Sequence, residues 1–227
     1  MRKLGIAVLA SVIVLLLSPA LSHFASPAFI FEACSCTAKD NSCSVSISCQ
    51  GGCTKFCGDN DNCHAECSGL YEVLGMEVTL EMQNGNYSQV VAELARVSGK
   101  ELTFSPTKPD MLFKAGFKKA ALWDALKLLS DHGTVRVQGQ DFEKFKRLRR
   151  TLLSGERISF GVKNTPVNTF VNDIASLTGL RLHIIAGRPT ATVNVELQDA
   201  SLSDILNTVA EQTGTKIIEE GADPGDQ

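Results

Sequence analysis

Two stretches of this chain carry the same residue pattern at a constant shift of 80 positions. Leu94–Gly99 (LARVSG) returns as Ile174–Gly179 (IASLTG), and Ala121–Leu126 (ALWDAL) returns as Ser201–Leu206 (SLSDIL). By the same shift, Val78, Leu80, Val90, Val91 and Phe117 correspond to Ile158, Phe160, Phe170, Val171 and Leu197. Agreement at one shift over such a length predicts a structural unit that occurs twice.

Each copy has the pattern of a strand, a helix, two strands, a second helix and a last strand. Val78–Met82 and Ile158–Val162 alternate between apolar and polar residues, which is typical of strands. The first helices carry apolar residues at helical spacing and stop at Gly99 and Gly179. In the second copy we expect Thr165 as the N-cap and Pro166 as the first helical residue.

The second half of each copy follows the same order. The expected strands are 101–104, 112–117 and 134–137 in the first copy, and 180–185, 192–197 and 216–218 in the second. The second helices carry the stripes Leu122, Ala125, Leu126, Leu129 and Leu202, Ile205, Leu206, Val209, and are expected to end at Gly133 and Gly214. We therefore predict an α+β fold with tandem β-α-β-β-α-β domains at 77–138 and 157–219. Both helices of a copy should pack on one face of a small sheet.

A linker helix is expected between the copies, within residues 139–156. Phe142, Phe145, Leu148 and Leu152 form its apolar stripe, and basic residues occupy the rest. The helix either connects the domains across their surfaces or docks on an acidic partner or an anionic membrane surface.

Four residues are candidates for partner binding. Trp123 lies beside the apolar stripe of its helix, so we expect it to be half exposed, either packed on a neighbouring helix or serving as an interface anchor. The other three candidates are basic residues of the linker helix: Lys144, Arg147 and Arg150.

All eight cysteines lie in a cysteine-rich segment, 34–68, and we expect every one of them to form a disulfide. They are Cys34, Cys36, Cys43, Cys49, Cys53, Cys57, Cys63 and Cys67. Their connectivity stays open, since eight cysteines allow 105 pairings. Zinc binding with His64 is the alternative, but in an oxidising compartment thiols pair first.

The residue spacing in this segment suggests its local structure. Residues 42–49 alternate like a strand, whereas the later cysteines recur every four residues, which suits one face of short helices. One pairing weighed for a helical hairpin joins Cys53 to Cys67 and Cys57 to Cys63.

The N-terminus has the features of a signal peptide, residues 1–22. Arg2 and Lys3 precede the apolar run Leu4–Leu17, and Ala20-Leu21-Ser22 suits a cleavage site; cleavage after Ala28 is the alternative. The run is shorter than a bilayer-spanning helix, which disfavours a retained anchor. We therefore expect an exported protein, with a disordered acidic tail at 220–227.

The repeated pattern resembles the short N-terminal domain (STN) shared by bacterial secretins and TonB-dependent outer-membrane receptors. Phe170-Val-x-x-Ile-Ala-x-Leu-Thr-Gly-Leu and Leu202-x-Asp-Ile-Leu carry the resemblance in the second copy, and Val91-Ala-x-Leu-Ala-x-Val-Ser-Gly carries it in the first. The resemblance implies a periplasmic location, protein–protein contact, and a secretion, pilus or receptor-signalling system. The sequence has no long β-rich region after the second copy, and the cysteine-rich segment is foreign to the pattern. The resemblance therefore implies an accessory or adaptor rather than a pore.

We expect a non-catalytic protein, because none of the four histidines and no serine or cysteine stands in a recognisable catalytic motif. No cofactor is expected. The net charge of −3 and the lack of aromatic stacking residues on the strands disfavour nucleic-acid binding. The expected partner is a protein, with self-association and peripheral outer-membrane association as further expectations. The alternative is an envelope-associated structural protein that binds through its cysteine-rich segment; a disulfide-framed enzyme inhibitor is a third class.

Overall fold

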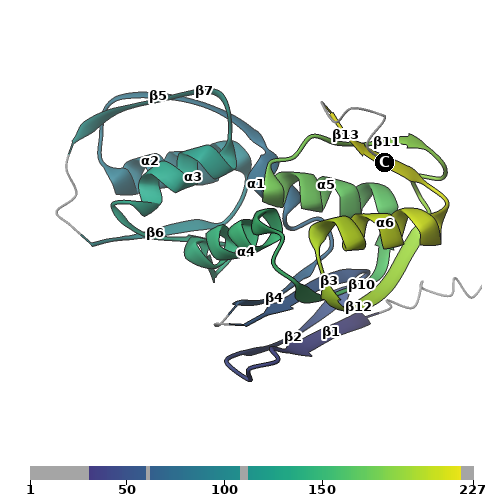
Figure 1. Ribbon diagram of the computed structural model, residues 1–227. Coiled ribbons are helices and arrows are strands. Elements are labelled where there is room, and N and C mark those ends of the chain that lie inside the picture. Colours follow the sequence, from purple (N-terminus) through teal and green to yellow (C-terminus); the bar gives the residue numbers. More distant parts are fainter. Residues whose placement is uncertain (1–30, 60–61, 108–111, 221–227) are drawn as a thin grey trace, which may run out of the picture.

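The computed structural model describes residues 31–59, 62–107 and 112–220, which form the α+β structure of Figure 1. Its strands are β1 (Phe31–Thr37), β2 (Ser44–Gln50), β3 (Cys53–Gly58), β4 (Asn62–Cys67), β5 (Glu77–Gly85), β6 (Leu102–Pro106), β7 (Phe113–Ala121), β8 (Gly133–Val137), β9 (Gln140–Asp141), β10 (Ile158–Pro166), β11 (Leu182–Ala186), β12 (Thr192–Ala200) and β13 (Lys216–Glu219). Its helices are α1 (Glu72–Gly75), α2 (Tyr87–Ser98), α3 (Leu122–Ser130), α4 (Phe142–Ser154), α5 (Val167–Thr178) and α6 (Leu202–Thr213). The expected signal peptide, and the expected disordered tail beyond Glu220, lie outside the described residues.

Strand pairing repeats with the same shift as the sequence. Strand β5 pairs antiparallel with β7, and β10 pairs antiparallel with β12. The corresponding residue pairs are Val78–Ala120 with Ile158–Ala200, and Leu80–Phe117 with Phe160–Leu197. Each ladder has an irregularity between these two pairs. The shift of 80 residues therefore holds for backbone register as well as for residue type.

The expectation that both helices of a copy pack on one face of a single sheet is wrong. Strands β5 and β7 form one sheet, and β6, β8 and β9 form another. Helices α2 and α3 lie between these two sheets, just as α5 and α6 lie between the β11–β13 pair and the sheet that contains β10 (Figure 1). Adjacent buried residues such as Val90 and Val91, or Phe170 and Val171, widen the apolar stripe so that one helix contacts two layers.

Strands, rather than the expected short helices, carry the later cysteines. Strand β3 pairs with β4 and also with β10, which gives a four-stranded sheet in the order β12-β10-β3-β4. A spacing of four residues places side chains on one face of a strand as well as of a helix, so the spacing could not distinguish the two. The cysteine-rich segment thus extends the sheet of the second half and covers the edge of β10.

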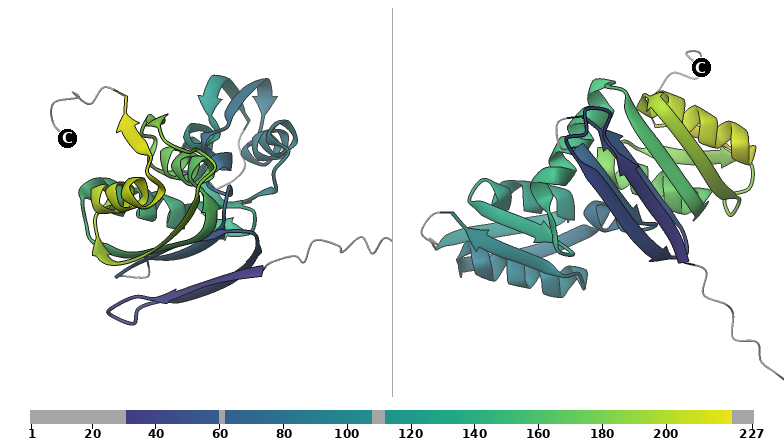
Figure 2. Two further views of the ribbon diagram at one scale, coloured as in Figure 1. Left: turned by 90° about the vertical axis from the view of Figure 1, so that its right-hand side faces the viewer. Right: turned by 90° about the horizontal axis from the view of Figure 1, so that it is seen from below.

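Four disulfides join the β1–β2 hairpin to the β3–β4 hairpin, which lies beside it in Figure 2. The bonds are Cys34–Cys53, Cys36–Cys57, Cys43–Cys63 and Cys49–Cys67. The pairing weighed for a helical hairpin is wrong: Cys53 and Cys67 are opposite each other in the β3–β4 ladder, but each bonds to the other hairpin. Dense cross-linking suits a segment whose own apolar residues are few.

A buried lysine adds a polar link between the two layers. The Lys55 ammonium donates to the Ser35 carbonyl at 2.9 Å and pairs with the Glu196 carboxylate at 2.5 Å. The Lys55 side chain passes Gly161, where an added Cβ would lie 2.3 Å from its Cε atom. Any larger residue at position 161 would therefore block the Lys55 side chain on its way from β3 to Glu196 of β12.

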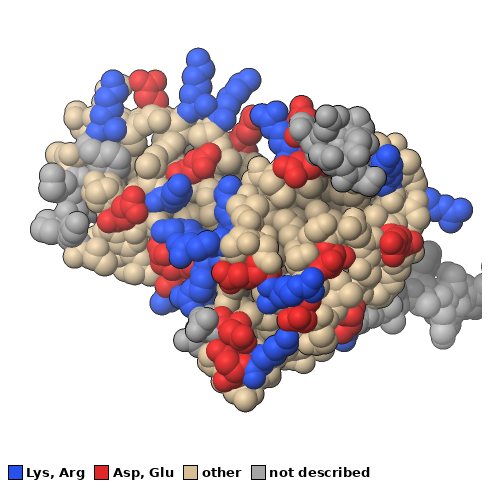
Figure 3. Space-filling model, in the orientation of Figure 1, with Lys and Arg blue, Asp and Glu red and all other residues tan. Residues whose placement is uncertain are grey.

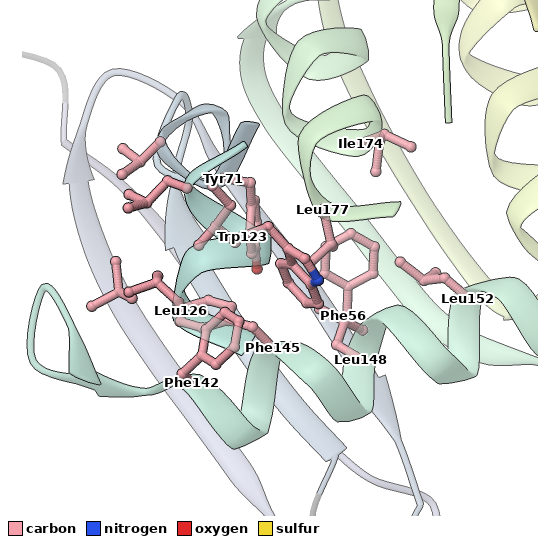
Figure 4. Packing of buried hydrophobic residues seen from close by; sticks show 14 of the residues in the cluster. Phe56, Tyr71, Trp123, Leu126, Phe142, Phe145, Leu148, Leu152, Ile174 and Leu177 are labelled. Atoms are coloured by element: carbon pink, nitrogen blue, oxygen red, sulfur yellow. The ribbon is translucent and has the colours of Figure 1, made fainter. Parts of the chain in front are cut away.

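The linker helix is close to its expected bounds. It starts after Asp141, whose carboxylate accepts the Glu143 amide, and ends at Gly155 in the left-handed conformation. Its apolar stripe is buried against both halves of the molecule (Figure 4). Helix α5 begins one residue later than expected, with Pro166 as its N-cap. Thr165 instead shares a hydrogen bond with Ser68 at 2.5 Å.

We predict that the unreduced protein contains the four disulfides above and no bond between Cys53 and Cys67. Opposed side chains of one ladder cannot pair while each is bonded to the other hairpin. Peptide mapping by mass spectrometry after partial reduction and alkylation measures the pairing. Recovery of a Cys53–Cys67 or Cys57–Cys63 peptide from native protein would contradict the stacked-hairpin arrangement.

Candidate functional site

Trp123 is buried, so the expectation that it would be half exposed is wrong. Its side chain is 6% exposed and its ring centroid lies 4.9 Å from that of Phe142. The Arg149 guanidinium carbon lies 4.5 Å from the centroid of the Trp123 ring, within the range of a cation–π contact. Both contacts come from α4, so Trp123 anchors this helix on α3 within the molecule.

The basic candidates lie together on the opposite, outer face of α4. Lys144, Arg147 and Arg150 are exposed and recur every three residues, which places them along one stripe. Lys and Arg side chains gather over this helix in Figure 3. The structure therefore separates Trp123, which faces inward, from the three basic residues, which face solvent.

A buried polar cluster lies where the β3–β4 hairpin meets α4 and α5. Glu66 of β4 is 3% exposed and accepts a hydrogen bond from the Gln140 side-chain amide. Burial, and then the nearby Asp173 carboxyl, raises the pKa of Glu66 to about 8. Burial lowers the pKa of His64, on the same face of β4, to about 4. At neutral pH these buried groups are therefore mostly uncharged.

Asp173 connects α5 to the start of α1. Its carboxylate accepts the backbone amides of Gly69 at 2.8 Å and Glu72 at 3.0 Å. Burial raises the pKa of Asp173 to about 6, and these amide hydrogen bonds oppose that shift. Tyr71 is 1% exposed and its hydroxyl has no hydrogen-bond partner. The cluster thus consists of four buried side chains: His64, Glu66, Tyr71 and Asp173. Because all four are enclosed, a substrate cannot reach them, and we assign the cluster a role in packing and stability.

An open apolar groove of about 400 Å³ lies between α6 and the β11–β13 sheet. Its described lining is Leu180, Leu182, Leu202, Ser203, Leu206, Asn207, Ala210, Ile217, Ile218 and Glu219. Leu206 and Ile217 are only partly buried, so the expectation that the whole α6 stripe faces inward is wrong at Leu206. Uncharged residues make up much of the surface over α6 in Figure 3. Seven of these ten lining residues are apolar, so the groove has mostly apolar walls.

The same surface of the first half is covered by α4. Leu126 and Val135, which correspond to Leu206 and Ile217 by shift and strand pairing, are 0% and 1% exposed. Trp123, the counterpart of Ser203, contacts Phe142. The Lys146 ammonium donates to the hydroxyl of Ser130, the counterpart of Ala210, at 3.2 Å. Within the described part of the chain, the groove is therefore the uncovered equivalent of the surface on which α4 packs.

Sequence reasoning missed this groove, although a signal for it exists. An amphipathic segment follows the first copy, whereas residues 220–227 after the second copy (EGADPGDQ) include no large apolar residue. The burial of Leu126 and the partial exposure of Leu206 show that α4 covers, in the first half, the surface that forms the groove in the second.

No protein-family model, curated protein or solved structure matches this chain. Within the described residues, no helix has the length and apolar character needed to cross a membrane. Among these same residues, no group of three or more histidine, cysteine, aspartate or glutamate side chains is arranged to hold a metal ion.

We predict that Leu126→Ala destabilises the protein far more than Leu206→Ala. The first change opens a cavity under α4 and should cost about 3 kcal/mol, whereas the second trims a groove wall and should cost about 1 kcal/mol. Urea unfolding followed by Trp123 fluorescence measures both losses. Equal losses would mean that Leu206 is as enclosed as Leu126.

We predict that the protein loses stability as the pH rises from about 4.5 to about 8, because the pKa of Glu66 is raised in the folded state. The unfolded chain ionises first, so the native state is progressively disfavoured over this window. Glu66→Gln keeps the acceptor for Gln140 and removes the titrating group, so it should flatten this slope by about 2 kcal/mol. Thermal unfolding from pH 5 to pH 8.5 measures the effect.

Two other groups titrate in or near this range and must be separated from Glu66. The pKa of Asp173 is also raised, so the stability that its protonated form contributes is lost as the pH rises from about 3.8 to about 6. The pKa of His64 is lowered, so its effect is lost as the pH falls from about 6.5 to 4. The difference between wild type and Glu66→Gln above pH 6 isolates Glu66. An unchanged slope there would show that Glu66 is ionised in the folded protein.

Proposed function

We propose that the protein is an exported, non-catalytic adaptor that binds another protein at the groove beside α6. The observation that carries this proposal is the uncovered groove, whose equivalent in the first half is filled by α4. Grooves with apolar walls are a recurring binding site for amphipathic helices of other proteins. The adaptor serves a secretin-type secretion or pilus system, or TonB-dependent receptor signalling.

Two further observations support this proposal. The four disulfides favour an oxidising compartment such as the periplasm. The pairing register that repeats after 80 residues supports tandem domains of the STN type, in keeping with the sequence pattern they share. Domains of that type serve protein–protein contact in the families that the sequence resembles.

Strand addition is the less favoured binding mode at the free edge of β12. The backbone amide of Asn194 donates to the Gln212 side-chain oxygen at 3.0 Å, and its carbonyl accepts from the Gln212 amide at 2.6 Å. The Asp199 carbonyl accepts from Arg157 at 2.6 Å, and Asp199 has a positive φ of 56°. Side chains and an irregularity thus occupy an edge that an added strand would need.

The alternative function, binding through the cysteine-rich segment, rests on the β1–β2 hairpin. Alternate residues of β2, such as Ser46, are exposed on the side away from the disulfides. Deleting residues 34–68 would not test this alternative cleanly. It would remove β3, whose Phe56 side chain is fully buried and packs on Phe160 of β10. Single-residue probes are therefore required.

We predict that a photo-crosslinking residue at Asn207 captures a protein partner in cells that make this protein. Asn207 is exposed and lines the groove. Lys127, the equivalent exposed position on α3, is the matched control, because α4 covers the neighbouring surface. Ser46 reports on the β1–β2 hairpin.

Immunoblotting and mass spectrometry then show which positions yield a defined adduct. An adduct at Asn207 alone supports the groove. An adduct at Ser46 alone would transfer binding to the cysteine-rich segment, and adducts at none of the three positions would contradict the adaptor function.

A further inference from the structure

We propose that the groove beside α6 takes a basic amphipathic helix that presents two aromatic side chains three residues apart. This inference rests on the proposed function and specifies the chemistry of the partner at the same site. The template is α4, a helix of this chain that already packs on the equivalent surface.

The fit of α4 on the first half defines what the groove can accept. Phe142 and Phe145 are buried at 0% and 1% exposure, and Phe142 contacts Trp123 at the position equivalent to Ser203. Phe142, Phe145 and Leu126 point toward one another in Figure 4. In the second half, Leu206 provides the same wall, and no described residue covers it as α4 covers Leu126. A helix with aromatic residues at i and i+3 would present to the groove the same face that α4 presents to the first half.

Charge favours a basic helix in the groove. Glu219 is the charged residue in the described lining, whereas Glu220, which follows β13, pairs with Arg181 at 3.3 Å. In α4, six of the thirteen residues are charged, and five of these six are basic: Lys144, Lys146, Arg147, Arg149 and Arg150. Asp124 of α3 faces Arg149 in the first half, whereas its counterpart Asp204 pairs with Arg157 at 3.6 Å. Glu219 beside apolar walls complements a basic helix of the α4 type.

A second copy of this chain cannot offer α4 to the groove. The apolar stripe of α4 is 0–2% exposed, so presenting it to another molecule would open the core between the two halves. We therefore infer that the helix comes from a different protein. Its polar face would carry Lys or Arg, and its apolar face would carry the paired aromatic residues.

We predict that a synthetic peptide with the sequence of residues 141–155 binds the intact, oxidised protein at the groove. The expected dissociation constant is on the order of 100 μM, since one short helix buries a small interface and must be ordered on binding. Isothermal titration calorimetry measures the affinity, and amide NMR shifts locate the peptide. Shifts are expected at residues of α6 and β13.

Three variants test the contacts without altering buried residues. Ser203→Trp restores the aromatic wall of the first half and should tighten binding about tenfold. Asn207→Arg places a positive charge in the groove and should weaken binding at least tenfold, which corresponds to about 1.4 kcal/mol of binding free energy. Glu219→Lys should weaken it several-fold and reduce its salt dependence. Circular dichroism spectra verify that each variant is folded.

The matched control peptide carries Asp at both positions 142 and 145 and should not bind. NMR shifts confined to α3, or no binding together with no effect of Ser203→Trp, would overturn the inference. A dimer of the protein that Asn207→Arg dissociates would also overturn it, because the groove would then hold a second copy. Tighter peptide binding by a chain ending at Glu220 would do the same, because residues 221–227 would then compete for the groove. An Asn207 crosslink without peptide binding would leave the adaptor function standing and refute only the helix chemistry.

Discussion

The packing of the α4 stripe is the interaction on which the rest of this structure depends. Phe142 packs on Trp123 of α3, and Phe145 packs on His64 of β4. Leu148 and Leu152 extend the same buried surface toward the second half. All four are within one continuous apolar core that also contains Phe56 of the cysteine-rich segment. Full burial of side chains this large contributes roughly 1.5–3 kcal/mol each. The helix therefore fixes the positions of the two halves and of the hairpin relative to one another.

The β3–β4 hairpin has two faces with different physical tasks. Cys53, Lys55 and Cys57 face the β1–β2 layer, where disulfides and one ammonium group hold two small sheets together. Phe56 and His64 face the main core, where Phe56 packs on Phe160 and His64 lies beside Phe145. The alternation of a strand is what allows six consecutive residues to serve both layers. Covalent links on one face thus support apolar packing on the other.

Local patterns predicted the helices well, because apolar stripes and glycine stops depend on near neighbours. Gly99, Gly179 and Gly214 all end helices in the left-handed conformation, as their positions indicated. The expected stop at Gly133 is wrong, because α3 already ends at Ser130 and Gly133 begins β8. The strand conformation around Cys53 and Cys67 was missed because a four-residue spacing suits helix and strand alike. The pairing of β3 with β10 and the burial of Trp123 under α4 join residues distant in sequence, and no local pattern encodes them. Leu126 is buried and Leu206 is partly exposed although both occupy the same position of the repeat, so the groove depends on tertiary packing and not on local sequence.

The two halves solve one packing problem in different ways, and the difference is informative. Each second helix presents an apolar stripe wider than its two flanking sheets can bury, so one side needs a further cover. The first half receives α4 from its own chain, and Trp123 enlarges the contact. In the second half, the small Ser203 takes the place of the tryptophan and the stripe meets an open groove. A serine in place of a large apolar residue lowers the cost of exposure in the unbound protein, while Leu206 and Ile217 retain the apolar walls that binding requires. The groove is thus suited to a partner that comes and goes, whereas α4 is a permanent part of the fold.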